Sequence, residues 1–419
     1  MKSHGDLGTN TCVPYRIDTE IKGSKSIINR FLCMSLYHNI GISICNINLC
    51  DDVIEMLEIL KVIGKHFEIK DDTLEICHEK PFTLLMNEYT MGIKNAGTVL
   101  RFILPYLAFA EYKTVIITLG DRLSKRPIVQ LIDCLNRAGA NISFENDVII
   151  IRKHRYIKNV FVAEGNETSQ FISSLMMFGT SRNVVTKIVI PDFQNVVSKS
   201  YIKMTESILY KFNIEIKYID NEIYIMPTDL KLTDKLNIIC DPDYSTACYY
   251  FMYSYLMQKE IYIKKITDLH QPDYYFIDVL KKYNINFIET DDSISVDVDN
   301  IGDFPDDTSI DMGDMPDQII TLAFMAFINN KKIYINGCHT LNLKESNRLE
   351  GISENIKRLG GSSFITENSI TIFPLNSEPK KCILTTFDDH RFAMTFMVLK
   401  QKYTYLEIDN IDCVRKSFI

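Results

Sequence analysis

The chain has 419 residues, of which 46% are hydrophobic and 24% are charged. These proportions are typical of a globular protein with a large core, and the length favours about two to three domains. The 46 Lys and Arg against 54 Asp and Glu give a net charge of −8, which argues against a nucleic-acid or anionic membrane partner. Any anion-binding site must therefore be a local cluster of basic side chains.

The amino-terminal sequence has no apolar segment of the kind found in secretory signal peptides. No apolar run reaches the roughly 20 residues that a membrane helix needs. The 11 cysteines are scattered and never spaced as CxxC, and Cys45 and Cys50 are the closest pair. Free thiols in a reducing compartment explain this pattern best. We therefore expect a cytoplasmic protein without a disulfide framework and without a metal site.

Six segments share one design, in which small or polar residues lead into an apolar helix. They begin at residues 24, 95, 168, 245, 316 and 389, so successive starts are 71, 73, 77, 71 and 73 residues apart. Helix ends marked by Gly or Asn, such as Gly64, Gly139 and Asn213, keep the same spacing and precede short alternating strands. Two landmarks with one spacing indicate an internal repeat of six α/β units, each of about 70 residues.

Six units in a row suggest two lobes of three, with each apolar helix buried and its polar start at the lobe end. If the lobes face each other, several helix N-termini point into one cleft. Helix N-termini carry free N–H groups and a partial positive charge, so such a cleft would bind anions. Alternatively, the polar starts are simple caps, which does not account for Lys or Arg at three of the six.

The first two helix starts contain candidate binding groups. Gly23-Ser24-Lys25-Ser26 places a Lys and two hydroxyl groups beside a long apolar helix, although Ser is also a favoured N-cap. Arg30 lies one turn after Ser26, and an Arg on an apolar helix needs an anionic partner. Asn95-Ala96-Gly97-Thr98 lets backbone approach a ligand because Gly97 has no side chain, although a plain tight turn would have the same sequence.

Later segments add charged candidates. The loop at residues 121–127 carries three cations within five residues, so it is either simply solvated or a clamp for phosphate or carboxylate. Lys344 and Arg348 lie at i and i+4 beside Glu345, and like charges at this spacing repel unless an anion lies between them. Asp317 precedes a wholly apolar helix, which makes it the candidate general base; the alternative is an N-cap.

Together these segments resemble the EPSP synthase family from near one end of the chain to the other. Residues 21–30 are similar to its PGSKSxSNR motif, and residues 95–98, 126–128, 168–171 and 198–202 are similar to NAGT, RPI, SSQF and SKPYI. Residues 311–317, 344–348, 388–394 and 414–418 are similar to DM…PDA, KESDR, NDHRMAM and the terminal K-S/T-F. Each match is weak alone, but nine in the family's order are specific.

The resemblance implies an α/β fold of two lobes, an inside-out α/β barrel with three βαβαββ units in each lobe. Residues 1–21 and 241–419 would form the first lobe, and residues 22–240 the second. It also implies transfer of the enolpyruvyl group of phosphoenolpyruvate to the 5-hydroxyl of shikimate 3-phosphate, through a tetrahedral intermediate that releases phosphate. Positioning and charge stabilisation would suffice, so we expect no metal or organic cofactor and a monomer that supplies both lobes.

The resemblance also assigns residues to the site. Shikimate 3-phosphate would be held by Lys25, Ser26, Arg30, Thr168, Ser169, Gln170, Ser198, Asp317 and Lys344. Phosphoenolpyruvate would be held by Lys25, Gly97, Arg126, Gln170, Arg348, Arg391 and Lys416. Asp317 would take the 5-hydroxyl proton, and Glu345, aided by Lys25, would deliver or recover the proton at the methylene carbon.

The chain departs from the family pattern at a few positions, none of which removes a proposed catalytic group. Phe102 stands where many members have Arg-Pro, Ser200 replaces a usual Pro, Asn347 a usual Asp and Asp388 a usual Asn, and the chain stops soon after Lys416. Because Gly97 is kept, we expect glyphosate to inhibit in competition with phosphoenolpyruvate.

Two alternatives remain. The sister enolpyruvyl transferase that acts on UDP-N-acetylglucosamine would share the architecture but carry a reactive Cys in a mobile loop, whereas the loop at residues 121–127 has none and Cys134 falls in an expected helix. A non-catalytic relative would keep the fold, but the joint presence of Asp317, Glu345 and Lys25 argues against it. We also expect the cleft to be open without ligand and closed with it.

Overall fold

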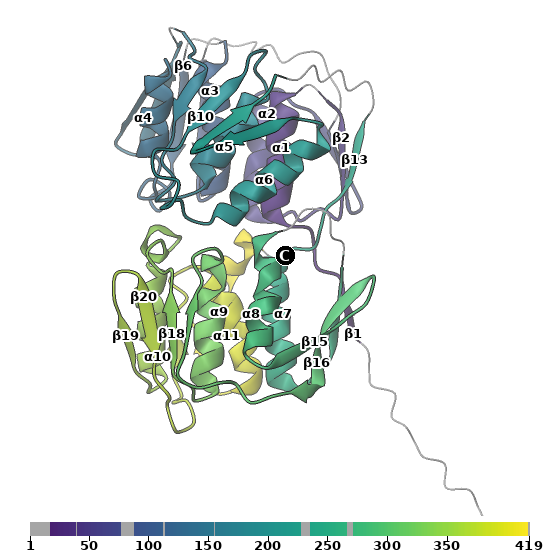
Figure 1. The fold of residues 1–419 in the computed structure, drawn as a ribbon, viewed down its shortest axis with the longest axis vertical. Coiled ribbons are helices and arrows are strands. Elements are labelled where there is room, and N and C mark those ends of the chain that lie inside the picture. The colour runs from purple at the N-terminus through teal and green to yellow at the C-terminus, as the bar shows by residue number, and fades with distance from the viewer. Residues whose placement is uncertain are drawn as a thin grey trace, which may run out of the picture.

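The computed structural model describes residues 17–38, 40–76, 88–111, 114–154, 156–227, 235–265 and 271–417. Residues 1–16 of the expected first lobe, and Phe418 of the carboxy-terminal motif, lie outside the described residues. Two groups of helices and sheets are stacked on each other (Figure 1). The predicted two-lobed α/β fold is therefore confirmed.

The second lobe contains three similar units built around apolar helices. Its elements are α1 (Lys25–Tyr37), β2 (Ile42–Cys45), α2 (Asp51–Val62), β3 (Phe67–Lys70), β4 (Thr73–Ile76), β5 (Glu88–Ile93), α3 (Gly97–Phe109), β6 (Thr114–Leu119), α4 (Val129–Arg137), β7 (Asn141–Glu145), β8 (Val148–Arg152), β9 (Val160–Val162), α5 (Gln170–Gly179), β10 (Thr186–Val189), α6 (Lys199–Lys211), β11 (Ile216–Ile219), β12 (Glu222–Ile225) and β13 (Leu236–Ile239). They form sheets in the orders β13-β2-β4-β3, β5-β6-β8-β7 and β11-β12-β10-β9.

The first lobe repeats this plan with one shortened unit. Its elements are β1 (Ile17–Thr19), α7 (Tyr244–Met257), β14 (Ile261–Lys264), η1 (Pro272–Tyr275), α8 (Phe276–Lys282), β15 (Ile285–Glu289), β16 (Ser293–Ile301), β17 (Thr308–Asp311), η2 (Pro316–Gln318), α9 (Ile319–Ile328), β18 (Ile333–Asn336), η3 (Leu341–Leu343), α10 (Arg348–Arg358), β19 (Ser363–Ile365), β20 (Ser369–Ile372), β21 (Ile383–Leu384), α11 (His390–Lys402), β22 (Glu407–Ile408) and η4 (Asp412–Lys416). Two sheets have four strands, in the orders β1-β14-β16-β15 and β17-β18-β20-β19. The sixth sheet, within the described residues, pairs only β21 with β22, and η4 follows in place of a hairpin.

Six apolar helices form the two lobe interiors. In the second lobe α1, α3 and α5 contact one another, and in the first lobe α7, α9 and α11 do so. Residues 319–327 of α9 are all buried, as expected for a helix that is apolar on every side. No helix in the described part of the chain is long and apolar enough to cross a membrane.

The buried apolar residues form two clusters, one between Ile27 and Cys240 and the other from Ile21 and from Tyr244 onwards. We therefore propose that the lobes comprise residues 22–240 and the flanking segments, as the resemblance implies. In each lobe, the last strand before the chain crosses to the other lobe joins a sheet whose other strands lie far away in the sequence. β1 pairs in parallel with β14, and β13 pairs in parallel with β2 from the start of the same lobe.

The two chain crossings between the lobes pair with each other. Ser24 N–H donates to the Asp241 carbonyl and Asp243 N–H donates to the Lys22 carbonyl, each at 2.9 Å. Between these bonds, a Cβ on Gly23 would lie 2.3 Å from the Asn46 carbonyl oxygen, so the close approach requires glycine. This crossing is followed directly by Lys25 at the start of α1. The hydrogen bonds at the lobe junction therefore fix the backbone position of Lys25.

Asn355 of α10 hydrogen-bonds to the shortened unit, which contains β21, α11 and β22. The fully buried side chain accepts from Thr385 N–H at 2.8 Å and donates to the carbonyls of Gly351 at 2.9 Å and Thr385 at 3.0 Å. Thr385 lies just before the start of α11. Asn355 therefore connects α10 to the segment that positions α11.

We expect Asn355→Ala to lower the free energy of unfolding by about 3 kcal/mol, because three buried hydrogen bonds contribute ~1 kcal/mol each. Urea unfolding followed by circular dichroism measures the change. Lys357→Ala, at an exposed position of the same helix, is the control and should unfold with the parent. Equal midpoints for both variants would contradict this role of Asn355.

Candidate active site

A cavity between the lobes is lined by the starts of helices from both of them. The second lobe contributes the starts of α1, α3, α5 and α6, and the first lobe contributes η2 before α9, and the starts of α10 and α11. Thirteen of the fifteen predicted site residues line it: Lys25, Ser26, Gly97, Arg126, Thr168, Ser169, Gln170, Ser198, Asp317, Lys344, Glu345, Arg348 and Arg391. The repeat therefore brings together segments that are spread over more than 350 positions of sequence.

The cavity is locally positive although the chain is acidic. Its lining includes five Lys or Arg and three Asp or Glu, against a net charge of −8 for the whole chain. The N-cap side chains of α1, α3, α5 and α6, all within the described chain, make no capping hydrogen bond. The backbone N–H groups at these helix starts add to the positive potential. The cavity is therefore suited to ligands with several negative charges.

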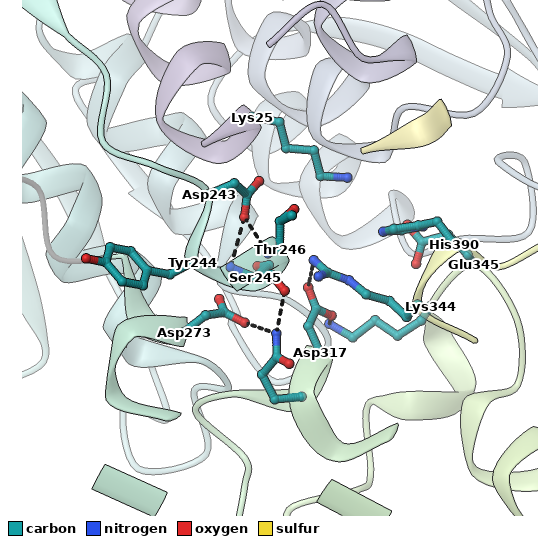
Figure 2. A network of polar contacts seen from close by, with 12 residues as sticks. Lys25, Asp243, Tyr244, Ser245, Thr246, Asp273, Asp317, Lys344, Glu345 and His390 are labelled. Atoms are coloured by element: carbon teal, nitrogen blue, oxygen red, sulfur yellow. Dashed lines mark hydrogen bonds and ion pairs between the residues drawn. The ribbon is translucent and has the colours of Figure 1, made fainter. Parts of the chain in front are cut away.

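Asp317 is surrounded by cations at the start of η2. Its two carboxylate oxygens accept from Arg348 Nη1 at 2.6 Å and Arg391 Nη2 at 2.9 Å, and Lys344 Nζ lies 4.0 Å away. Burial alone would raise the pKa of Asp317, but Arg391, Arg348 and Lys344 outweigh it and hold the pKa well below its usual range. This pairing favours the ionised form of Asp317, and Figure 2 shows Lys344 beside its carboxylate.

Arg348 connects three carboxylates beneath the cavity. Besides Asp317, it binds Asp389 through Nε at 2.8 Å and Glu345 through Nη2 at 2.9 Å, and its side chain is 1% exposed. Glu345 also lies 3.3 Å from Arg126 Nη1 of the second lobe. Burial opposes ionisation of Glu345, but Arg126 and Arg348 hold its pKa well below the usual range. Two guanidinium groups, one from each lobe, therefore meet at one glutamate.

Lys25 and Lys416 share a carboxylate that the sequence analysis missed. Asp52 of α2 accepts from Lys25 Nζ at 3.0 Å and lies 3.4 Å from Lys416 Nζ. Burial lowers the pKa of Lys25, but Asp52, together with Cys50 and Glu345, outweighs burial, and the pKa of Lys25 is raised. Asp51 and Asp52 give α2 the acidic first turn that is common to many helices, so the sequence carried no signal to single out Asp52.

Gly97 and Gln170 lie where two arginines approach the start of α3. A Cβ on Gly97 would lie 2.9 Å from Arg126 Nη1. Gln170 donates to Thr98 Oγ1 at 3.2 Å and accepts from Arg101 Nη1 at 2.8 Å. Burial and the adjacent Arg126 lower the pKa of Arg101 to about 9. The amide of Gln170 is therefore held in a fixed orientation at the cavity wall.

Two predicted residues lie outside the cavity lining. The buried guanidinium of Arg30 donates to Thr205 Oγ1 at 2.8 Å and to the Ser26 carbonyl at 2.9 Å, one turn behind the cavity. Lys416 lines an adjoining cavity that shares Arg126 and Glu345. Its ammonium group donates to the Asn95 carbonyl at 2.7 Å and lies 3.8 Å from Glu345.

Tyr201 and His390 line the cavity as well but were not among the predicted site residues. Tyr201 of α6 donates across the lobes to Asp273 Oδ2 at 2.8 Å, and Asp273 is itself bound by Gln318 of η2. Burial, with Lys25 and Arg391 nearby, holds the pKa of His390 well below its usual range, so its ring is neutral. The basic helix start was recognised from sequence, but the inward orientation of His390 needs the structure. In Figure 2, Lys25 lies on one side of the cavity and Asp317, Lys344, Glu345 and His390 on the other.

Comparisons with known proteins agree over nearly the full chain. A family model described as EPSP synthase (3-phosphoshikimate 1-carboxyvinyltransferase) matches residues 14–419. The 3-phosphoshikimate 1-carboxyvinyltransferase of Buchnera aphidicola subsp. Cinara cedri is 28% identical, with 95% of this chain and 91% of the relative covered. The Haemophilus ducreyi enzyme of the same name is 27% identical, with 96% and 94% covered.

The fold is also that of a solved relative. The EPSP synthase structure from Acinetobacter baumannii superposes with a TM-score of 0.70 at 18% identity, covering 97% of this chain and 94% of that one. This likeness supports the inside-out arrangement of two lobes. The chain therefore belongs to the EPSP synthase family and has 3-phosphoshikimate 1-carboxyvinyltransferase activity, the step of the shikimate pathway that uses shikimate 3-phosphate and phosphoenolpyruvate on the way to aromatic amino acids.

Proposed function

We propose that the cavity between the lobes binds both substrates side by side and that its own side chains carry the reaction. The observation that supports this most is the cluster of cations drawn from both lobes around Asp317 and Glu345. Both substrates carry a phosphate and a carboxylate, which are the groups that Arg, Lys and open helix starts recognise. The chemistry then consists of proton transfers and charge stabilisation, for which no cofactor is proposed.

In this proposal shikimate 3-phosphate lies against the second lobe. Its phosphate meets the hydroxyl-rich starts of α5 and α6, and its carboxylate meets the start of α1. Lys344 approaches from the first lobe, beside Asp317. Arg30 acts from behind, because its bonds to Ser26 and Thr205 hold the first turn of α1 in place. The proposed set is Lys25, Ser26, Arg30, Thr168, Ser169, Gln170, Ser198, Asp317 and Lys344.

Phosphoenolpyruvate is assigned to the arginine side of the cavity. Its carboxylate would displace the carboxylates that now pair with Arg348 and Arg391, and its phosphate would lie between Arg126 and Lys416. Gly97 leaves room for the substrate beside Arg126, and Lys25 reaches both substrates. The proposed set is Lys25, Gly97, Arg126, Gln170, Arg348, Arg391 and Lys416.

Asp317 is proposed to take the proton from the 5-hydroxyl as its oxygen bonds to C2 of phosphoenolpyruvate. With its pKa far below the usual range, Asp317 alone would be a weak base. A substrate carboxylate on Arg348 and Arg391 would neutralise the cations that depress this pKa. Binding of phosphoenolpyruvate would therefore make Asp317 more basic at the moment when a base is needed.

The charge states of Lys25 and Glu345 indicate which of them delivers a proton to the methylene carbon and which recovers one. Lys25 is protonated, since its pKa is raised, whereas Glu345 is ionised. Lys25 is thus the group with a proton to deliver to C3 as the methyl group forms. Glu345 is the group that recovers a proton from that methyl as phosphate leaves and the double bond returns. Each role uses the group in the form that the unliganded site already holds.

We also propose a cytoplasmic monomer that closes on its substrates. Every residue assigned to the site comes from one chain, so no partner subunit is required. None of the nine cysteines of the described chain forms a disulfide, which suits a reducing compartment. Contacts such as Tyr201 to Asp273 join the lobes across the cavity, and substrates would enter only when these separate.

Phosphate release tests the assignment of substrates. With phosphoenolpyruvate present, we expect release when shikimate 3-phosphate is added and none when UDP-N-acetylglucosamine is added in a parallel assay. Release only with the nucleotide sugar would keep the fold and overturn the acceptor. Binding of phosphoenolpyruvate without release in either assay would indicate a non-catalytic relative.

Asp317→Ala tests the proposed base. We expect kcat to fall by about 10² or more, because a positioned base contributes on that scale. Phosphate release at saturating concentrations of both substrates gives the value. Asp314→Ala, at an exposed position three residues earlier, is the matched control and should keep the parent kcat. A kcat within a few-fold of the parent for Asp317→Ala would reject the role.

Glyphosate tests the space beside Gly97. We expect the parent enzyme to be inhibited in competition with phosphoenolpyruvate, and Gly97→Ala to raise the inhibition constant roughly tenfold, the scale of a small overpacking penalty. A Cβ there would meet Arg126, whereas one on Gly92 would have an ordinary 3.5 Å contact with Thr118 Oγ1. Gly92→Ala is therefore the control. Parent activity that persists in millimolar glyphosate would contradict the prediction.

A further inference from the structure

The segment before α3, residues 94–96, is held from two sides. Glu55 of α2 accepts from Lys94 N–H through Oε1 at 2.5 Å and from Ala96 N–H through Oε2 at 2.8 Å. The carbonyl between these two amides, that of Asn95, accepts from Lys416 Nζ at 2.7 Å. The Glu55 carboxylate and the Lys416 ammonium group therefore both hydrogen-bond to the backbone of residues 94–96.

These hydrogen bonds fix the orientation of two peptide groups, the one before Lys94 and the one between Asn95 and Ala96. The amides of Lys94 and Ala96 converge on Glu55 as backbone N–H groups converge on an anion in a nest. With both amides engaged, the peptide between Asn95 and Ala96 cannot rotate without breaking a bond to a carboxylate. The Asn95 carbonyl belongs to this same peptide group, so the bond from the Ala96 amide to Glu55 also keeps that carbonyl directed toward Lys416. The next residue is Gly97, which abuts Arg126.

Glu55 also shares its helix with the carboxylate that pairs the two site lysines. Asp52 and Glu55 are three residues apart on α2, a spacing that places them on one face. Asp52 binds Lys25 and lies 3.4 Å from Lys416. The first turns of α2 thus hold Lys416 by two routes, directly through Asp52 and indirectly through Glu55 and the Asn95 carbonyl.

We infer that Glu55 is a positioning residue for the phosphoenolpyruvate half of the site: it fixes residues 94–96 so that Asn95 receives Lys416 and Gly97 lies against Arg126. This inference rests on the proposed assignment of Lys416, Gly97 and Arg126 to phosphoenolpyruvate. It predicts an asymmetric effect, because shikimate 3-phosphate is assigned to other helix starts. A merely structural contact would instead lower stability and leave the two substrates equally affected.

The test measures kcat and both KM values by phosphate release in the full-length enzyme. For Glu55→Ala we expect the KM for phosphoenolpyruvate to rise about tenfold or more, the scale of losing hydrogen bonds to a charged group. The KM for shikimate 3-phosphate should stay within about twofold on the same reasoning. Glu55→Gln keeps the shape and one acceptor, and should be intermediate. Glu58→Gln, exposed on the same helix, is the control.

A double-mutant cycle with Lys416→Met distinguishes a failure of the role of Glu55 from a failure of the proposed phosphoenolpyruvate site. If Glu55 acts through Lys416, Glu55→Ala should add little to the KM for phosphoenolpyruvate in the Lys416→Met background. Equal changes in both KM values, full additivity with Lys416→Met, or an unchanged KM in Glu55→Ala would each overturn the role of Glu55. If Lys416→Met itself leaves the KM for phosphoenolpyruvate unchanged, the site assignment fails and this inference fails with it.

Discussion

The buried ion-pair network around Arg348 is the interaction on which the site depends. Its guanidinium binds Asp317, Glu345 and Asp389, and both Arg348 and Asp389 are almost fully buried. Removing such charges from water is costly unless they are paired. The pairing therefore fixes the relative positions of η2, α10 and α11, at whose starts Asp317, Glu345 and Arg391 lie. A site for two polyanions is thus assembled around internal anions that hold its cations in place.

The same network explains how the cavity can exchange one set of anions for another. In the structure Asp317 and Glu345 neutralise cations that the proposal assigns to the substrates. Those cations are already withdrawn from water and oriented, so a substrate carboxylate replaces a protein carboxylate and the reorganisation required is small. The displaced carboxylates then lose the partners that suppress their basicity. Binding and the activation of the base are in this way linked through shared arginines.

Much of this arrangement could be read from the sequence because it repeats. The six polar starts at a spacing near 73 residues predicted helices at Lys25, Gly97 and Gln170 within a few residues of where they begin. The pairing of β13 with β2 joins residues about 190 positions apart, and alternation alone does not identify such partners. Asp52 and Tyr201 were missed because an acidic helix start and a helical Tyr are common features. The resemblance assigned Arg30 to the shikimate 3-phosphate site, and its position one turn behind the cavity could not be predicted because helical spacing gives the face of a residue but not its depth.

The two lobes bring different kinds of group to the cavity, and this difference makes closure part of the chemistry. In the second lobe the N-cap side chains of α1, α3, α5 and α6 make no capping hydrogen bond, whereas in the first lobe Asn347 and Asp389 cap α10 and α11. The second lobe thus offers backbone N–H groups with Lys25 and Arg126, and the first offers the carboxylate pair with its arginines. Neither lobe alone holds all the groups assigned to either substrate, because Lys25, Arg126 and Gln170 come from the second lobe and Lys344, Arg348 and Arg391 from the first. Only when they meet do Arg126 and Glu345 pair, so the closure that excludes water also completes the site.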